Sequence, residues 1–405
     1  MRTLPRTWLA LAVGGAALLA RSARAQLSDG VVKIGVLSDM SSLYTDLAGA
    51  GSVVAAKMAV EDSGIEKRGI KVAIVSADHQ NKPDIGSNIA RQWYDVDKVD
   101  VIVDVPNSGV ALAVNQITRD KGKALLVSGA GTADLTGKAC SPNTIHWTYD
   151  TWMLAHGTGE AIVKTGGKTW FFLTADYAFG QSLEANTEAV VLKNGGKVLG
   201  KVRHPLNTQD MSSFLLQAQS SKAQIIGLAN AGGDTVNAIK QAAEFGIGKG
   251  GQSLAGLLVF ITDVHALGLP TAQGLILSST FYWDSNADTR KFAKRFAEQN
   301  KGIHPTMVHA GVYAAVRHYL KAVEALKTDD GTKVVAKMKD TPTDDPLFGK
   351  GSIRADGRKI HPVYLFEVKK PSESKHPWDY YKLRSTIPAA DAFRPISEGN
   401  CPLVK

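Results

Sequence analysis

Short apolar runs alternate with helix-like segments along the first part of the chain. Residues 31–37 form an apolar, β-branched run typical of a buried strand. Residues 47–62 follow with apolar positions at the spacing of one helix face. The alternation continues with predicted strands at 70–75, 99–103 and 124–127 and predicted helices at 85–96 and 109–119. This order predicts a parallel sheet with helices on both faces.

The same alternation restarts in the second part of the chain. Helices are predicted at 152–164, 181–193, 211–219, 235–245, 288–300 and 307–327, and strands at 169–174, 197–203, 224–228, 257–261 and 274–279. Residues 357–370 alternate like one arm of an antiparallel hairpin. The pattern therefore predicts an α/β fold with two doubly wound, Rossmann-like halves. The segment after residue 370 is rich in Pro, Ser and charge, and we expect it to wrap the body of the molecule.

The first 25 residues have the features of an export signal. Two arginines precede an apolar run at 8–20, and Ala23 and Ala25 form an A-x-A cleavage site. The run is shorter than the ~20 apolar residues of a membrane span. We therefore expect cleavage after Ala25 and a mature chain outside the cytoplasm. Cleavage removes four arginines and no acidic residue, so the net charge falls from +9 to +5, and the scattered basic residues do not support nucleic-acid binding.

The chain of 405 residues has only two cysteines, Cys140 and Cys401. In an oxidising compartment we expect them to form a disulfide that fastens the C-terminal tail, the alternative being two independent thiols. No Cys/His spacing indicates a metal site.

Motifs of nucleotide-binding enzymes are incomplete in this chain. The segment 131–139 has the wrong glycine spacing for a P-loop and lacks its hydroxyl, and Gly49 and Gly51 lack the third glycine of a dinucleotide fingerprint. No G-x-S-x-G or H-E-x-x-H motif is present. We therefore expect a binding protein without a cofactor rather than an enzyme.

The loops that follow the predicted strands carry the candidate chemistry. In open α/β sheets, ligands bind beyond the carboxyl ends of the strands, where helix N-termini offer unpaired N–H groups. The loops of the first half are rich in small and hydroxyl-bearing residues, whereas those of the second half combine aromatic and acidic residues. Helix capping is the alternative role for each hydroxyl. The candidate ligand-binding residues are Ser41, Tyr44, Asn107, Ser108, Ala130, Gly131, Thr132, Tyr177, Phe179, Gly232, Asp263 and Tyr282.

The order of these motifs resembles the type I periplasmic binding proteins of the branched-chain-amino-acid class, which feed ABC importers. The resemblance lies in VVKIGVLSDMSS, VDVPNSGVALAV, LLVSGAGTADLTG, TADYAFGQS and AGGDTVNAIKQAAEFGI, and in FYWDSNADTRKFAKRFAEQ and HAGVYAAVRHYLKAVEAL. It implies two lobes joined by three crossovers, near residues 147–151, 278–282 and 351–356. The implied domains are a signal peptide (1–25), lobe 1 (26–148 and 281–353), lobe 2 (149–280 and 354–370) and a wrapping tail (371–405).

The resemblance also implies roles for single residues. A ligand carboxylate would be held in lobe 1 by Ser108, Ala130 and Thr132, and an amino-acid ammonium would meet Asp263 in lobe 2. The aromatic ring at Phe179 would flank the ligand side chain. This chain departs from the family pattern with Ser41-Ser42 where Ser-Gly is usual, and with Phe179 where Tyr is common.

Two stretches, VDVPNSGVALAV and CSPNTIHWTYDTW, look like a subgroup associated with aromatic acids. Tyr44, Tyr177, Phe179, Tyr282 and Trp283 could supply the stacking surfaces for such ligands. Hinge packing is an equal alternative for Tyr282 and its neighbour Trp283.

The resemblance therefore implies a monomeric, periplasmic solute-binding protein that captures a small carboxylate by hinge closure and delivers it to a membrane permease. An aromatic acid is the first choice of ligand, and a branched-chain or related amino acid is the second. The other classes considered are a ligand-sensing receptor subunit and an exported enzyme.

Overall fold

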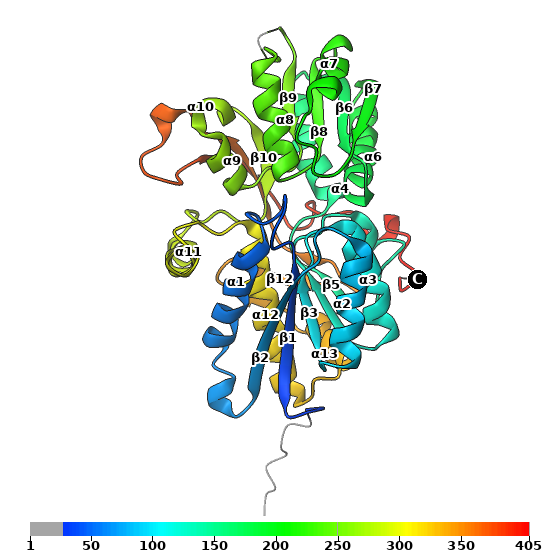
Figure 1. Ribbon diagram of the computed structural model, residues 1–405, viewed down its shortest axis with the longest axis vertical. Helices are drawn as coiled ribbons and strands as arrows, with labels where there is room; N and C mark the ends of the chain where they lie inside the picture. The colour runs from blue at the N-terminus through cyan, green and yellow to red at the C-terminus, as the bar shows by residue number, and fades with distance from the viewer. Residues whose placement is uncertain (1–26, 249, 405) are drawn as a thin grey trace, which may run out of the picture.

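Two parallel sheets, one in each lobe, form the framework of the molecule (Figure 1). The computed structural model describes residues 27–248 and 250–404, so the predicted signal peptide and its cleavage site lie outside the described residues. The strand order is β2-β1-β3-β4-β5 in the first lobe and β7-β6-β8-β9 in the second. These strands are β1 (Val31–Ser38), β2 (Lys71–Asp78), β3 (Val101–Asp104), β4 (Ala124–Val127), β5 (Thr144–His146), β6 (Thr169–Ala175), β7 (Lys197–His204), β8 (Ile225–Ala229) and β9 (Ser253–Gly256). The predicted α/β fold class with two lobes is confirmed.

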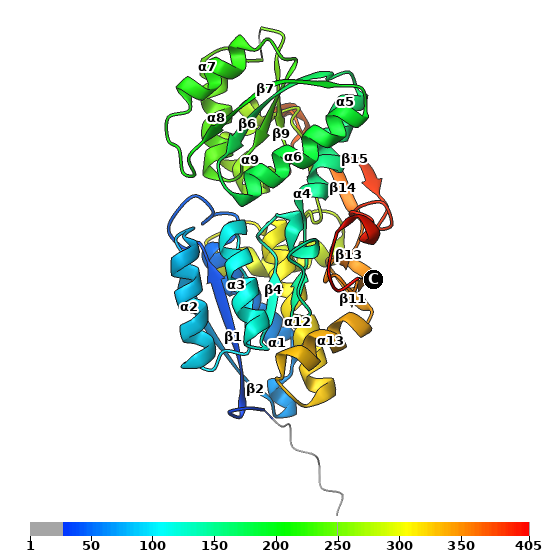
Figure 2. The same cartoon turned by 90° about the vertical axis from the view of Figure 1, so that its right-hand side faces the viewer.

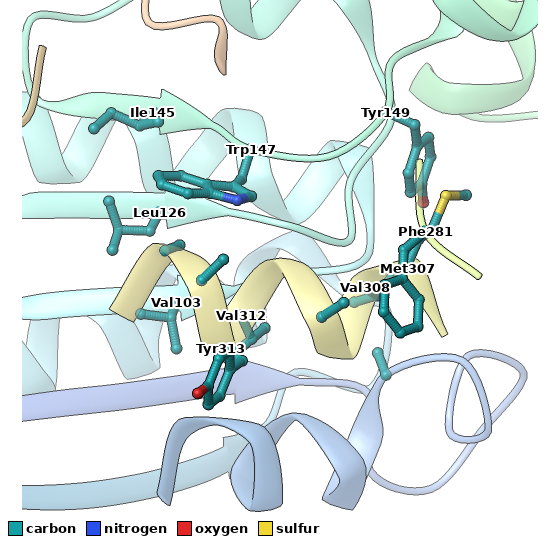
Figure 3. Packing of buried hydrophobic residues seen from close by; sticks show 14 of the residues in the cluster. Val103, Leu126, Ile145, Trp147, Tyr149, Phe281, Met307, Val308, Val312 and Tyr313 are labelled. Carbon is teal, nitrogen blue, oxygen red and sulfur yellow. The ribbon is translucent and has the colours of Figure 1, made fainter. Parts of the chain in front are cut away.

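Helices cover both faces of the sheet in the first lobe. They are α1 (Gly49–Ser63), α2 (Pro83–Asp95), α3 (Ser108–Asp120), α11 (Ala287–Gln299), α12 (Met307–Leu326) and α13 (Gly331–Asp340). Successive side chains of a strand point to opposite faces, so Val103 packs in the core that includes α1 and α12, whereas Ile102 packs with α2 and α3. Figure 3 shows Val103, Leu126 and Trp147 around α12. Because both faces of this sheet are covered, its buried strands are continuous apolar runs in the sequence.

The second lobe differs from the sequence prediction in two places. Its helices are α4 (Thr151–Leu154), α5 (Glu160–Lys164), α6 (Ala178–Lys193), α7 (Ser212–Ser220), α8 (Gly233–Glu244), α9 (Ile261–Leu267) and α10 (Leu269–Ala272). The helix predicted at 152–164 contains one π turn at Ala155–Gly159, where Gly157 passes so close to Ser278 that a Cβ would lie 2.2 Å from its Oγ. The strand predicted at 257–261 is wrong, because β9 ends at Gly256 and α9 begins at Ile261.

Two small antiparallel sheets accompany the two parallel sheets. They are formed by β10 (Ile276–Ser279), β14 (Val363–Val368) and β15 (Tyr381–Ile387), and by β11 (Thr343–Asp345), β12 (Gly349–Ile353) and β13 (Lys359–Ile360). Ser352 pairs with Ile360, and Arg358 bridges to His146 of the first lobe. These pairings lead us to place the third crossing after Ile360, later than the 351–356 expected from the sequence. The segment expected to be a wrapping tail also contains β15, which pairs with β14.

The C-terminal segment returns from β15 to the first lobe, and Figure 2 shows it along the side of that lobe near β13. The predicted Cys140–Cys401 disulfide is confirmed, with the two Cα atoms 5.6 Å apart. Two residues that precede Cys401 also hold this segment. Arg394 Nη2 donates to the Ala133 carbonyl (3.0 Å), and the centre of the Phe393 ring lies 4.4 Å from the Arg358 guanidinium. No helix among the described residues is long and apolar enough to cross a membrane.

We expect removal of this disulfide to lower the free energy of unfolding by about 2–5 kcal/mol, because the bond closes a long loop of the unfolded chain. The bond joins residues 261 positions apart. The test is urea unfolding of the Cys140→Ser/Cys401→Ser double variant. Reductant should bring the wild type down to the level of the variant and leave the variant unchanged; a fully reduced wild type of undiminished stability would contradict the prediction.

Candidate ligand-binding cleft

The candidate cleft lies between the lobes, at the carboxyl ends of the strands of both parallel sheets. Its walls are formed by Tyr44, Leu47, Pro106, Gly129, Gly131, Tyr149, Tyr177, Phe179, Ala231, Leu258 and Phe260. The space left between them is about 10 Å³, room for about one water molecule. The lobes are therefore closed on one another, and a ligand the size of a benzoate would enter only when they part.

Aromatic side chains from both lobes meet in this cleft. The hydroxyl groups of Tyr44 and Tyr177, which come from opposite lobes, are hydrogen-bonded to each other. The Tyr149 ring lies edge-on to Phe260, with 5.9 Å between ring centres, and Phe179 lies 6.1 Å from Tyr177. Burial, together with the neighbouring Tyr177, raises the pKa of Tyr44 well above its ordinary value. The cleft therefore presents neutral phenols and aromatic faces to a ligand.

A direct backbone contact holds the lobes together beside these tyrosines. The Gly233 N–H donates to the Leu43 carbonyl across the cleft (3.2 Å). The preceding residue, Gly232, has φ +56°, and a Cβ there would lie 2.5 Å from the same carbonyl oxygen. Both the backbone conformation and the close approach favour glycine at this position. Gly232, a predicted site residue, thus lies at the interlobe contact.

The loop after β1 is organised by a carboxylate that sequence reasoning did not single out. Asp39 Oδ2 accepts from the Tyr44 N–H (2.8 Å) and from Asn81 Nδ2 (2.6 Å), which fixes the position of Tyr44. Ser41 is exposed and donates its hydroxyl to Asp78 (2.5 Å). The structure therefore brings Tyr44 into the cleft, and Ser41 is not among the residues that form its walls.

The predicted carboxylate-binding loops of the first lobe come together below the aromatic residues. Ser108 Oγ accepts from the N–H groups of Gly131 (3.3 Å) and Thr132 (3.1 Å), which leaves the Ser108 O–H able to donate. Asn107 caps α3 by accepting from the Val110 N–H (3.0 Å). Gly131 packs under the rings, since a Cβ there would lie 2.8 Å from Phe179 and 2.9 Å from Tyr149. Gly131 is a wall residue of the cleft, whereas Ser108 and Thr132 are buried behind it.

The other two predicted residues of these loops, Thr132 and Ala130, form hydrogen bonds with neighbouring protein groups in the closed form. Thr132 Oγ1 accepts from the Asp134 N–H (3.3 Å). The carbonyl oxygen of Ala130 accepts from His146 Nε2 (2.7 Å). Both residues are buried beside Gly131.

Asp263 lies behind the cleft wall in this structure. Its Oδ2 accepts from the Phe260 N–H (2.8 Å) at the start of α9, and burial raises its pKa to about 7. Asp263 is not among the residues that form the walls. The carboxylate that the family pattern assigns to a ligand ammonium therefore caps a helix here.

Tyr282 lies in a hinge-side cluster apart from the cleft. The centre of its ring is 5.0 Å from that of Tyr381 and 5.5 Å from that of Phe366. Its neighbour Trp283 donates its indole N–H to the Trp378 carbonyl (2.9 Å). These contacts are those of the hinge packing that was the alternative for this pair.

Sequence reasoning missed part of the cleft wall. Tyr149 donates its hydroxyl to the Gly129 carbonyl; the stretch CSPNTIHWTYDTW contains it, but Tyr149 was not singled out as a site residue. Leu258 and Phe260 belong to the apolar run that was predicted as a strand. That run is buried because it faces the cleft, and strand periodicity alone does not separate the two cases.

Comparison with known proteins agrees with this architecture. A family model described as periplasmic binding protein matches residues 31–375. A crystal structure of a periplasmic binding protein from Burkholderia mallei is 55% identical to this chain and covers 93% of it and 100% of its own chain, with a TM-score of 0.91. A branched-chain amino acid ABC transporter periplasmic ligand-binding protein from Burkholderia xenovorans LB400 is 41% identical, with coverages of 92% and 100% and a TM-score of 0.81.

A more distant structure shows the same fold. The solute-binding protein of an ABC transporter from R. palustris, in complex with benzoate, is 23% identical, with coverages of 92% and 100% and a TM-score of 0.80. At that identity the likeness shows the fold alone. The relatives are substrate-binding proteins of transporters, not enzymes. From the extent of the family match and the high identity to the Burkholderia proteins, we conclude that this chain belongs to the periplasmic binding protein family of ABC transporters.

Proposed function

We propose that this protein is the periplasmic solute-binding component of an ABC importer and that it captures a small aromatic carboxylate in the interlobe cleft. The observation that carries the proposal is the composition of the cleft walls, where Tyr44, Tyr149, Tyr177, Phe179 and Phe260 surround one small space. Aromatic rings prefer offset or edge-to-face contact with other rings. A benzoate-like ring placed between these side chains would have such contacts on several sides.

The lobe 1 loops would receive the carboxylate of such a ligand. The Ser108 O–H can donate, and the N–H groups of Gly131 and Thr132, which now point to Ser108 Oγ, lie at the same place. Hydrogen bonds to a charged acceptor are stronger than those between neutral groups. The R. palustris protein, which has the same fold, is in complex with benzoate.

A branched-chain or related amino acid is the second candidate ligand, supported by the likeness to the Burkholderia xenovorans protein. An amino acid carries an ammonium group that needs acceptors or a counter-charge when it is buried. Asp263 caps α9 and is not among the wall residues. The arrangement of the closed cleft thus favours the aromatic acid.

Hinge closure supplies the mechanism. The Tyr44–Tyr177 and Leu43–Gly233 hydrogen bonds join the two lobes. A ligand that binds the closed form more tightly than the open form shifts the population toward closure. The permease would then recognise the closed molecule. The proposal also includes cleavage after Ala25, a monomeric state and a periplasmic location. An oxidising periplasm would suit the Cys140–Cys401 disulfide.

Benzoate and 4-hydroxybenzoate are expected to raise the melting temperature of the purified protein, whereas leucine and valine leave it unchanged. A ligand at 100 times its Kd stabilises the native state by about 2.7 kcal/mol. Thermal unfolding with each compound measures this. Stabilisation by leucine alone would show that the ligand is an amino acid and not an aromatic acid. An unchanged melting temperature with all four compounds would reject both ligand classes.

Replacement of Ser108 by Ala is expected to weaken carboxylate binding about tenfold or more, because a hydrogen bond to a charged group contributes ~1.5–3 kcal/mol. Calorimetric titration with benzoate measures the loss. Ser141→Ala is the matched control, since its buried Oγ also accepts from a backbone N–H (Asn143, 3.2 Å) but in a turn of its own, whereas Ser108 bonds to the loop of the wall residue Gly131. Equal affinities of Ser108→Ala and the wild type would exclude this anchor.

Gly232→Ala is expected to weaken ligand binding at least tenfold, because the added Cβ would collide with the Leu43 carbonyl only when the lobes close. Gly195→Ala is the control: Gly195 also has a positive φ (+74°), but a Cβ there meets open space. Both variants should lose stability through backbone strain, and only Gly232→Ala should lose affinity. Similar affinities of the two variants would show that this contact does not limit closure.

A further inference from the structure

One buried carboxyl group lies directly behind the cleft wall. Asp104 ends β3, is fully buried and has φ +81°, and Val105 follows with φ +53°. Positive φ is rare for residues other than glycine, and consecutive residues in this region mark a locally strained turn. This turn leads directly into Pro106, which forms part of the cleft wall.

The two carboxylate oxygens of Asp104 have different surroundings. Oδ2 accepts from the Ser38 hydroxyl (2.7 Å), whereas Oδ1 has no hydrogen-bond partner among the described residues. Oδ1 lies 2.9 Å from the position that a Cβ would occupy on Gly129. Gly129 is itself a wall residue, so the unpaired oxygen is separated from the cleft by one residue without a side chain.

The charges around Asp104 disfavour its ionised form. Burial raises its pKa to about 7, while the hydroxyl groups of Ser38 and Ser52 lower it and the charge of Asp39 after β1 raises it further. The phenol of Tyr149 on the first crossing is the other titratable group that senses this carboxyl. None of the described residues that form the cleft walls is Lys, Arg or His. Asp104 and a ligand carboxylate would therefore share a site without a counter-ion.

We propose that Asp104 sets the charge state in which the cleft accepts its ligand, so that above neutral pH a carboxylate ligand binds together with a proton taken up by Asp104. The inference rests on the proposed function, because it requires a carboxylate in the cleft. Two negative charges in a poorly solvated site repel each other, and protonation of one relieves the repulsion. The proton comes from solvent and binds the Asp104 carboxylate, so that a neutral carboxylic acid lies behind Gly129 when the ligand anion is in the cleft.

The direction of the pH dependence follows from linkage. Below pH 7 Asp104 is already neutral, and binding needs no further proton. Above pH 7 the free protein must take up a proton, so affinity falls as the pH rises. With a pKa of about 7 in the free protein and full protonation in the complex, linkage predicts an affinity up to about 30-fold weaker at pH 8.5 than at pH 6, and uptake of up to about 0.8 proton per ligand at pH 7.5.

The experiment is calorimetric titration of benzoate into the wild type, Asp104→Asn and Asp100→Asn between pH 6 and 8.5, in buffers of different ionisation enthalpy. Benzoate is ionised throughout this range. Asp104→Asn should have a shallower pH dependence and take up fewer protons than the wild type, while Asp234 and Asp263, whose pKa values are also about 7, remain. Asp100 is the control: it comes directly before the first residue of β3, is buried and also has a raised pKa. Asp100→Asn should keep the pH profile of the wild type.

Leucine is titrated in parallel as a second carboxylate. If leucine binds and benzoate does not, the aromatic specificity fails while the proton linkage is still measured with leucine. If benzoate binds to the wild type with a flat pH profile, or if Asp104→Asn keeps the wild-type slope, this inference fails and the proposed function stands. Binding of neither compound at any pH overturns both.

Discussion

The closed form of this molecule depends on the close approach of two loops from opposite lobes. The Leu43 carbonyl receives the Gly233 N–H, and this geometry exists only because Gly232 has no side chain. Tyr44 follows Leu43 directly, so the same contact brings its hydroxyl to Tyr177. This backbone contact joins the closed lobes beside the two tyrosines and the small space that a ligand must enlarge to enter.

The electrostatics of the cleft limit which ligands can bind. Three carboxyl groups with raised pKa values surround it: Asp104 in the first lobe and Asp234 and Asp263 in the second. Asp234 and Asp263 accept backbone N–H groups, whereas Asp104 has an unpaired oxygen. With no cationic side chain among the described wall residues, an anion must be held by hydroxyl and backbone donors. Shape and aromatic contact then provide most of the selectivity.

The framework could be predicted from the sequence because each buried strand is a short apolar run and each helix has its own periodicity. The cleft was predicted in part: Tyr44, Gly131, Tyr177 and Phe179 follow strands directly and line it. Tyr149 and Phe260 line it through tertiary placement, which local patterns do not encode. Tyr282 has the same aromatic character but packs at the hinge. We place the third crossing later than the sequence prediction does, because the pairing of β13 with β12, which the sequence pattern did not indicate, keeps the chain beside the first lobe.

The central claim is that the interlobe cleft holds a small aromatic carboxylate. Its most direct test is mass spectrometry of the small molecules released when the protein, purified without added ligand, is denatured. The account predicts one aromatic carboxylic acid, in an amount that approaches one per chain and that falls in Gly232→Ala. Release of an aliphatic amino acid in the same stoichiometric amount would contradict it.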